Sequence, residues 1–268
     1  MRGPVIAGTD GSPAALRAVE WAAEEAVFRR APLVIAHAIP RWAVDIPVNQ
    51  SPEDDERARI MLAEAVSMSW ARRDGLEVTT EILDGRPEEA LAERAADAQL
   101  LVVGSRGGGE LASLLMGSTS RALTARPPCP TVVVRESSAH GEVVVEITGA
   151  HGQDPVLAFA FEEAALREAP LRAVHPWSHP KQRRHDDDLP EERRLLTDVL
   201  AGWRGAFPDV AVVQDLPHDR HRERLLVEAS ERAAMVVVGA HGWPVGLSTP
   251  ASHTLLRRAH CPVAVVAR

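Results

Sequence analysis

The sequence predicts an α/β fold of two repeated, doubly wound domains, each built on a five-stranded parallel sheet with helices on both faces. Short apolar runs alternate with longer helical segments, which is the pattern of strands and helices around a parallel sheet. A length of 268 residues suits two domains of ordinary size. A two-fold internal repeat is also present, since Ala31-Pro32-Leu33 returns as Ala169-Pro170-Leu171. We expect domains over 1–137 and 142–268.

The elements of the first domain follow from local signals. Ser12 followed by Pro13 predicts a helix start, because serine caps helices and proline suits their first turn. Pro87 marks a second such start. The strands are expected at 4–9, 33–39, 76–82, 100–103 and 131–135, and the helices at 13–30, 53–73, 86–96 and up to about residue 125. Residues 41–52, with two prolines, are expected to form a loop.

The second domain repeats this order with small changes in spacing. His37 returns as His175, Val102-Val103-Gly104 as Val237-Val238-Gly239, and Cys129-Pro130 as Cys261-Pro262. Residues 178–192 carry a basic run followed by three aspartates, and we expect a solvated loop between strand and helix there. A functional role for this charge run stays open.

Composition excludes several functions. The net charge of −8 argues against a general binder of nucleic acid or anionic membranes. Lys181 is the only lysine, so no lysine of a Walker-type loop is available. Cys129 and Cys261 occupy equivalent positions and are expected to be buried, reduced thiols. Without a signal peptide or an apolar stretch near the ~20 residues of a membrane span, we expect a cytoplasmic protein.

The stretch after the fourth strand is rich in glycine. Gly104 is followed by Gly107, Gly108 and Gly109 within six residues, and a second small-residue cluster, Gly117-Ser118-Thr119, comes shortly after. Glycine allows the backbone to approach a ligand, and backbone N–H groups at a helix N-terminus bind anions. The alternative is an ordinary glycine-rich turn between strand and helix.

The spacing of Gly104, Gly107 and Gly117-Ser118 resembles the nucleotide-binding signature of the universal stress protein family. The opening run 5–12 and the closing run 129–134 are also similar to those of that family. The resemblance covers the chain twice and implies a strand order of 3-2-1-4-5 in each domain. It also implies a bound adenine nucleotide, which is ATP or else ADP or AMP, with Mg²⁺ as a further candidate.

That strand order brings Asp10, after strand one, and Gly104, after strand four, to one crevice where the order reverses. Asp10, which accepts hydrogen bonds when ionised, suits the ribose hydroxyls, as the family resemblance also implies; its alternative is an Asx turn before Ser12. His37 is interpreted as a core or strand-end histidine. The candidate nucleotide-binding residues are Gly8, Asp10, Ala38, Val103, Gly104, Ser105, Gly107, Gly108, Gly117, Ser118 and Thr119, with Arg106 and Arg121 as possible added charge and no catalytic or metal-binding residue.

The second domain is expected to have a degenerate motif. Thr148 stands where the first domain has Asp10, and it supplies no carboxylate. Thr249-Pro250 replaces Gly117-Ser118, and proline has no N–H to offer a phosphate. Trp243 occupies space that Gly108 leaves open. An alternative alignment places Ser252 opposite Gly117 and still loses the glycine.

Three functions compete. The first is an adenine-nucleotide-binding stress or regulatory protein with its nucleotide in the N-terminal domain and little or slow hydrolysis. The second is a structural or interaction module of the same fold that binds no nucleotide. The third is a phosphoryl-transfer enzyme, for which the residues favour at most a weak ATPase because no Walker lysine and no general base are evident. The fifth strands, 131–135 and 262–267, are short and apolar, so we expect them to pair within the chain as a pseudo-dimer or between two chains as a homodimer.

Overall fold

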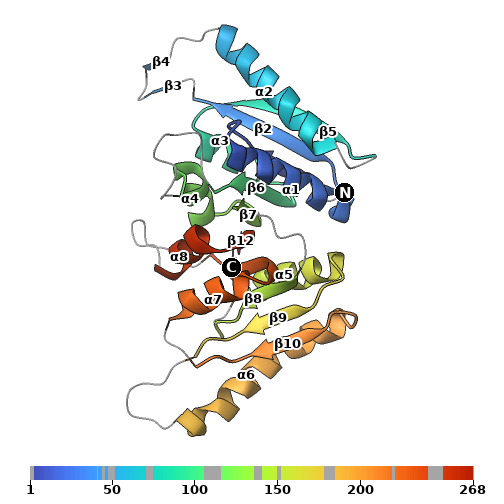
Figure 1. Cartoon of the computed structure of the whole chain (residues 1–268), viewed down its shortest axis with the longest axis vertical. Helices are drawn as coiled ribbons and strands as arrows, with labels where there is room; N and C mark the ends of the chain where they lie inside the picture. Colours follow the sequence, from blue (N-terminus) through green and yellow to red (C-terminus); the bar gives the residue numbers. More distant parts are fainter. Residues whose placement is uncertain are drawn as a thin grey trace. The chain divides into compact units, whose positions relative to one another are not determined.

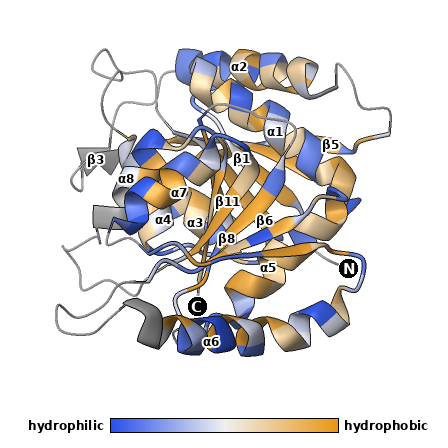
Figure 2. Ribbon diagram, turned by 60° about the horizontal axis from the view of Figure 1, so that its bottom comes forward, coloured by the Kyte–Doolittle hydropathy of each residue, from blue (hydrophilic) through white to orange (hydrophobic). Residues whose placement is uncertain are grey.

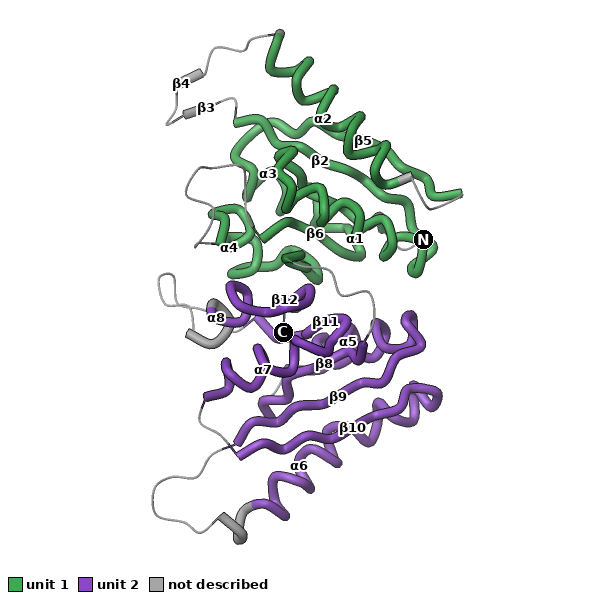
Figure 3. The backbone as a smooth tube through the Cα atoms, viewed as in Figure 1, with its two compact units in different colours: residues 1–137 green, residues 138–268 purple. Residues whose placement is uncertain are grey.

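The computed structural model describes residues 3–40, 42–43, 46–47, 52–70, 75–105, 116–135, 141–149, 152–177, 185–218, 221–240 and 250–267. It divides into two compact units, Met1–Ser137 and Ser138–Arg268 (Figure 3). Each unit alternates strands and helices along the chain (Figure 1).

The N-terminal unit has a five-stranded parallel sheet in the order β5-β2-β1-β6-β7, so the predicted order 3-2-1-4-5 is confirmed. Its main elements are β1 (Val5–Gly8), α1 (Pro13–Arg29), β2 (Leu33–Ile39), α2 (Pro52–Trp70), β5 (Val78–Asp84), α3 (Pro87–Arg94), β6 (Leu100–Gly104), α4 (Ser118–Ala125) and β7 (Thr131–Val134). Within the expected loop 41–52, the short strands β3 (Trp42–Ala43) and β4 (Ile46–Pro47) pair in antiparallel fashion. Two-residue strands are too short to show a sequence period.

The C-terminal unit repeats the arrangement as β10-β9-β8-β11-β12, again with parallel pairs. Its elements are β8 (Glu142–Glu146), α5 (Asp154–Leu166), β9 (Leu171–Val174), α6 (His185–Ala206), β10 (Val212–Asp215), α7 (Arg222–Ser230), β11 (Ala233–Gly239), α8 (Pro250–Arg258) and β12 (Val263–Val266). The expectation of a loop through residue 192 is wrong, because α6 begins at His185. Acidic residues near a helix start favour the helix, which the loop interpretation overlooked.

The cores are built from the central strands of each sheet. β1, β6 and β7 are buried along their whole length, as are β11 and β12. The ribbon of the central strands β6 and β11 is orange in Figure 2, which marks hydrophobic residues. Helices cover parallel strands on both faces, so these strands read as continuous apolar runs. By contrast, β5 at the edge of its sheet is only half-buried or exposed.

Fine backbone details also recur in both units. Arg30 and Glu168 follow the first helix of each unit and both have a φ of 50°, the left-handed conformation that ends helices. The next residues, Ala31 and Ala169, each donate their N–H to a carbonyl oxygen in the last helical turns at 2.9 Å. The arginine directly before each left-handed residue forms a buried ion pair with a glutamate four positions earlier, Arg29 with Glu25 and Arg167 with Glu163.

Candidate functional site

A pocket lies at the carboxyl ends of β1 and β6 in the N-terminal unit, where the strand order reverses. Gly8 and Val103 are register partners at this edge. Parallel sheets of this kind bind ligands at such a point. The pocket is lined by Gly8, Thr9, Asp10, Ala15, His37, Ala38, Pro87, Leu91, Val103, Gly104, Gly117, Ser118, Thr119 and Ser120.

The pocket brings together most of the predicted residues. Gly8, Asp10, Ala38, Val103, Gly104, Gly117, Ser118 and Thr119 all line it. Ser105 does not line the pocket, because it is buried and donates its backbone N–H to the Val134 carbonyl oxygen. Gly107 and Gly108 lie outside the described residues, as does Arg106. Arg121 is exposed on α4 and does not line the pocket.

Asp10 sits at the exposed rim and takes part in a local turn. Its Oδ1 accepts the Ser12 N–H at 3.0 Å, which is the Asx turn named above as its alternative role. Ser12 Oγ accepts the Ala15 N–H at 3.3 Å, so the predicted N-cap of α1 is confirmed. The turn fixes the carboxylate at the mouth of the pocket.

His37 holds the loop after β1 in place. Its Nδ1 lies 2.8 Å from the Thr9 carbonyl oxygen, and since a carbonyl only accepts, this nitrogen donates the proton. The residue lines the pocket while remaining half-buried at the end of β2. The interpretation of His37 as a strand-end residue agrees with this contact.

Two glycines of the pocket lie close to neighbouring atoms, and packing requires the one at position 104. A Cβ on Gly104 would lie 2.8 Å from backbone atoms of Ala14 and Ala15, so only glycine lets the start of α1 approach β6. A Cβ on Gly8 would lie 2.9 Å from the Leu91 side chain. Close packing alone therefore explains the glycine at 104.

The N-terminus of α4 faces the pocket. Gly117 donates its N–H to the Ser105 carbonyl oxygen at 3.1 Å, so this group is occupied within the chain. Ser120 Oγ donates to the Gly104 carbonyl oxygen at 2.6 Å and ties the helix to β6. The first N–H groups of a helix have no intrahelical acceptor, and here they belong to Ser118, Thr119 and Ser120. This end of α4 can accept an anion.

Sequence reasoning missed Pro87 and Leu91, which line the pocket from α3. Their spacing of four places them on one helix face, which was the available signal. Arg94 anchors α3 by two hydrogen bonds to Glu81 of β5, at 2.6 and 2.9 Å. The Glu81 hydrogen bond raises the pKa of Arg94.

The equivalent place in the C-terminal unit has different polar contacts. Thr148, at the position of Asp10, donates its N–H to Gln153 Oε1 at 3.1 Å, and its hydroxyl lies 3.4 Å from the same oxygen. Pro250 is the first residue of α8. Trp243 and Thr249 lie outside the described residues.

Other reactive groups lie away from the pocket. Burial raises the pKa of Cys129 and of Cys261 to about 12 each, so both thiols are neutral at physiological pH. In the described part of the chain, no group of three or more His, Cys, Asp or Glu side chains is placed to hold a metal ion. Within the same residues, no helix combines the length and apolar character needed to cross a membrane.

Comparison with known proteins matches both halves of the chain. The model of the universal stress protein family matches residues 1–135 and again 141–267. A universal stress protein of Mycobacterium tuberculosis is 34% identical over 275 residues, covering 98% of this chain and 96% of the relative. One of Mycobacterium bovis is 33% identical and covers 89% and 87%.

Among solved structures, a universal stress protein of Archaeoglobus fulgidus matches with a TM-score of 0.76 and 17% identity, covering 100% of this chain and 99% of that one. At this identity the match bears on the fold alone.

Proposed function

Since this chain belongs to the universal stress protein family and carries two of its domains, we propose that its N-terminal unit binds one adenine nucleotide, in the first place ATP. The nucleotide acts as a regulatory ligand, and the chain hydrolyses it slowly or not at all. Regulation requires that the nucleotide bind one conformation more tightly than another.

Each part of the nucleotide has a matching surface in the pocket. Ala38, Leu91 and Val103 offer apolar contacts to the base. The Asp10 carboxylate at the rim suits the two ribose hydroxyls, because an ionised carboxylate accepts hydrogen bonds. The N–H groups and hydroxyls of Ser118 and Thr119 at the start of α4 suit the phosphates.

One observation carries this proposal: an acidic side chain, a helix N-terminus and several apolar residues line the same pocket. Asp10 is the only carboxylate among its described lining residues. Because the described lining residues include no lysine or arginine, the phosphates would be held chiefly by backbone N–H groups and hydroxyls. We propose that Mg²⁺, where present, arrives with the triphosphate.

Titration calorimetry with ATP tests the proposal. The Asp10→Asn variant keeps an oxygen that can accept the Ser12 N–H but loses the negative charge. We expect one ATP per wild-type chain and at least about tenfold weaker binding by this variant, since hydrogen bonds to charged groups contribute roughly 1.5–3 kcal/mol. The matched control is Thr148→Ala at the repeat-equivalent position, which should bind as the wild type does.

The same titrations separate the competing functions. Absence of ATP binding by the wild type would contradict the proposal and favour a module that binds no nucleotide. If Asp10→Asn binds ATP with wild-type affinity, the role of Asp10 is confined to the Asx turn and its charge does not contribute to nucleotide binding. Turnover on the order of 1 s⁻¹ would identify an efficient phosphoryl-transfer enzyme instead. The pairing of the fifth strands stays a prediction.

A further inference from the structure

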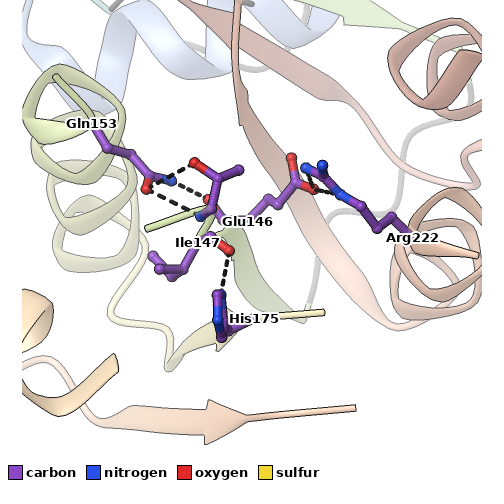
Figure 4. Close-up of polar contacts among 6 residues, drawn as sticks. Glu146, Ile147, Gln153, His175 and Arg222 are labelled. Atoms are coloured by element: carbon purple, nitrogen blue, oxygen red, sulfur yellow. Dashed lines mark hydrogen bonds and ion pairs between the residues drawn. The ribbon is translucent and has the colours of Figure 1, made fainter. Parts of the chain in front are cut away.

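Glu146 ends β8 in the C-terminal unit, at the position that Gly8 holds at the end of β1. It is 3% exposed. Its Oε1 accepts the Nε–H of Arg222 at 3.0 Å and a second hydrogen bond from Arg222 Nη2 (Figure 4). A buried carboxylate is therefore present where the N-terminal unit has no side chain at all.

Arg222 is the first residue of α7. The shift of 135 positions that relates 102–104 to 237–239 also relates Pro87 to Arg222 and Leu91 to Leu226. Gly8 and Pro87 both line the pocket of the N-terminal unit. Their counterparts in the C-terminal unit, Glu146 and Arg222, are joined by an ion pair, so two positions that border the pocket of the N-terminal unit are in direct contact here.

Gln153 adds to this internal contact. It stands at the position of Ala15, which lines the N-terminal pocket. Its Nε2 donates to the Glu146 carbonyl oxygen, while its Oε1 accepts from Thr148 (Figure 4). The larger side chain thus fastens the loop after β8 to the start of α5.

His175 holds the loop after β8 in the same way as His37 holds the loop after β1. Its Nδ1 lies 2.7 Å from the Ile147 carbonyl oxygen, the counterpart of the contact between His37 and Thr9. Its Nε2 lies 2.8 Å from Glu192 Oε2 of α6. The strand-end scaffold is the same in both units, and the side chains that face the ligand position differ.

We infer that Glu146 and Arg222 form a built-in ligand of the C-terminal unit, which closes the end of its first strand to the nucleotide that binds the other unit. The identity of the excluded ligand rests on the proposed function, whereas the closure rests on the contacts above. A buried carboxylate persists only when paired, so a small molecule entering here would first have to break this pair.

Chemical rescue tests the inference. The Arg222 side chain is 39% exposed, whereas Glu146 is buried. Arg222→Ala therefore leaves a buried carboxylate without its guanidinium partner, and an uncompensated buried charge is destabilising. We expect the melting temperature of the C-terminal unit to fall by roughly 10 °C. Millimolar guanidinium ion should restore part of this loss by refilling the vacated place, and an equal concentration of ammonium should not.

Two further variants control the rescue. Arg224→Ala removes an arginine of the same helix whose partner Glu228 is on the surface, so neither its stability nor its response to guanidinium should change much. Glu146→Gln combined with Arg222→Ala leaves no charge to neutralise, and its guanidinium response should vanish. The inference is overturned if Arg222→Ala melts like Arg224→Ala, or if it folds and guanidinium restores no more stability than ammonium.

A measurement on the wild type covers the case in which Arg222→Ala does not fold. The Nε–H of Arg222 donates to a buried oxygen, so in NMR it should exchange with solvent at least about tenfold more slowly than that of Arg224. Equal exchange rates would overturn the inference. Neither readout uses a nucleotide, so failure of ATP binding would contradict the proposed function and leave this result standing.

Discussion

The two units share a scaffold and differ at the place where a ligand would lie. Both have the same strand order and a left-handed residue after the first helix, Arg30 or Glu168. In both, a histidine at the end of the second strand (His37) or directly after it (His175) contacts the loop after the first strand. The scaffold therefore survives unchanged when the ligand-facing side chains change.

Four of the differences are linked to one another in the C-terminal unit. Gly8, Asp10, Ala15 and Pro87 line the N-terminal pocket, and their counterparts are Glu146, Thr148, Gln153 and Arg222. Three of these four replacements are larger. Hydrogen bonds link the four counterparts in a chain, from Thr148 to Gln153, from Gln153 to Glu146 and from Arg222 to Glu146. One unit thus leaves a space for a ligand where the other fills it with its own atoms.

The largest expected effect comes from transferring the ion pair. Gly8→Glu with Pro87→Arg places the Glu146–Arg222 pair in the N-terminal unit. We expect ATP binding to weaken at least about 100-fold, equivalent to roughly 2.7 kcal/mol, because the new side chains occupy the pocket. Titration calorimetry measures this change.

The control for that transfer is Gly8→Ala with Pro87→Ala, which alters the same positions without filling the pocket. The end of the flexible Leu91 side chain has to move slightly for either variant. If the folded variant with Gly8→Glu and Pro87→Arg binds ATP with wild-type affinity, the ion pair does not account for the difference between the units.

A second prediction separates packing from ligand binding at Gly104. Its missing Cβ leaves room for backbone atoms of Ala14 and Ala15, which cannot move aside as a side chain could. Gly104→Ala should lower the free energy of unfolding by about 1–3 kcal/mol, as overpacking does. Urea denaturation without nucleotide measures it.

Gly202 supplies the matched control in the other unit. It lies exposed in α6, and a Cβ there would meet nothing within 4 Å. Gly202→Ala should therefore raise stability by about 0.5–1 kcal/mol through helix propensity. Equal effects of the two substitutions would contradict the packing role of Gly104.

A third, smaller effect concerns the start of α1. Ser12→Ala removes the oxygen that accepts the Ala15 N–H and should cost about 1 kcal/mol of stability. Thermal unfolding compared with Ser67→Ala, an exposed serine within α2, isolates the cap. A loss in Ser67→Ala as large as in Ser12→Ala would argue against capping.

The smallest predicted effect is a loss of stability at high pH, and it should be of equal size in the two units. In the folded chain the pKa of Cys129 and of Cys261 is about 12, above the ordinary 9.0, so the unfolded chain loses these protons first. Stability from each thiol is complete well below pH 9 and falls as the pH rises, by about 0.4 kcal/mol per thiol at pH 9.

Replacing both cysteines by alanine should reduce the loss of stability between pH 7 and 9 in chemical denaturation. Parallel pH profiles of the wild type and this variant would show that the thiols do not contribute. If the single variants Cys129→Ala and Cys261→Ala change this loss by different amounts, the units differ in a way that the burial of the two thiols does not predict.

The fold was largely predictable from the sequence because buried parallel strands read as apolar runs and the chain shows them twice. Gly8, Asp10 and Gly104 were located by their place at strand ends, where topology alone brings them together. Pro87 and Leu91 were missed, since a helix that merely lines a pocket carries no motif of its own. The pair of Glu146 with Arg222 was also missed. The two residues are 76 positions apart, and no sequence pattern indicates their contact before the strands and helices are placed.

The internal pair of the C-terminal unit bears on the lifetime of the protein in the cell. A ligand stabilises only the part that binds it, by about 2.7 kcal/mol at a hundredfold excess over Kd. A unit that carries its own ligand gains nothing from the nucleotide supply and loses nothing when that supply falls. If the N-terminal unit binds adenylate as proposed, depletion of adenylate would make the first half of the chain more sensitive to proteases than the second half, and a fall in energy charge would cause selective degradation.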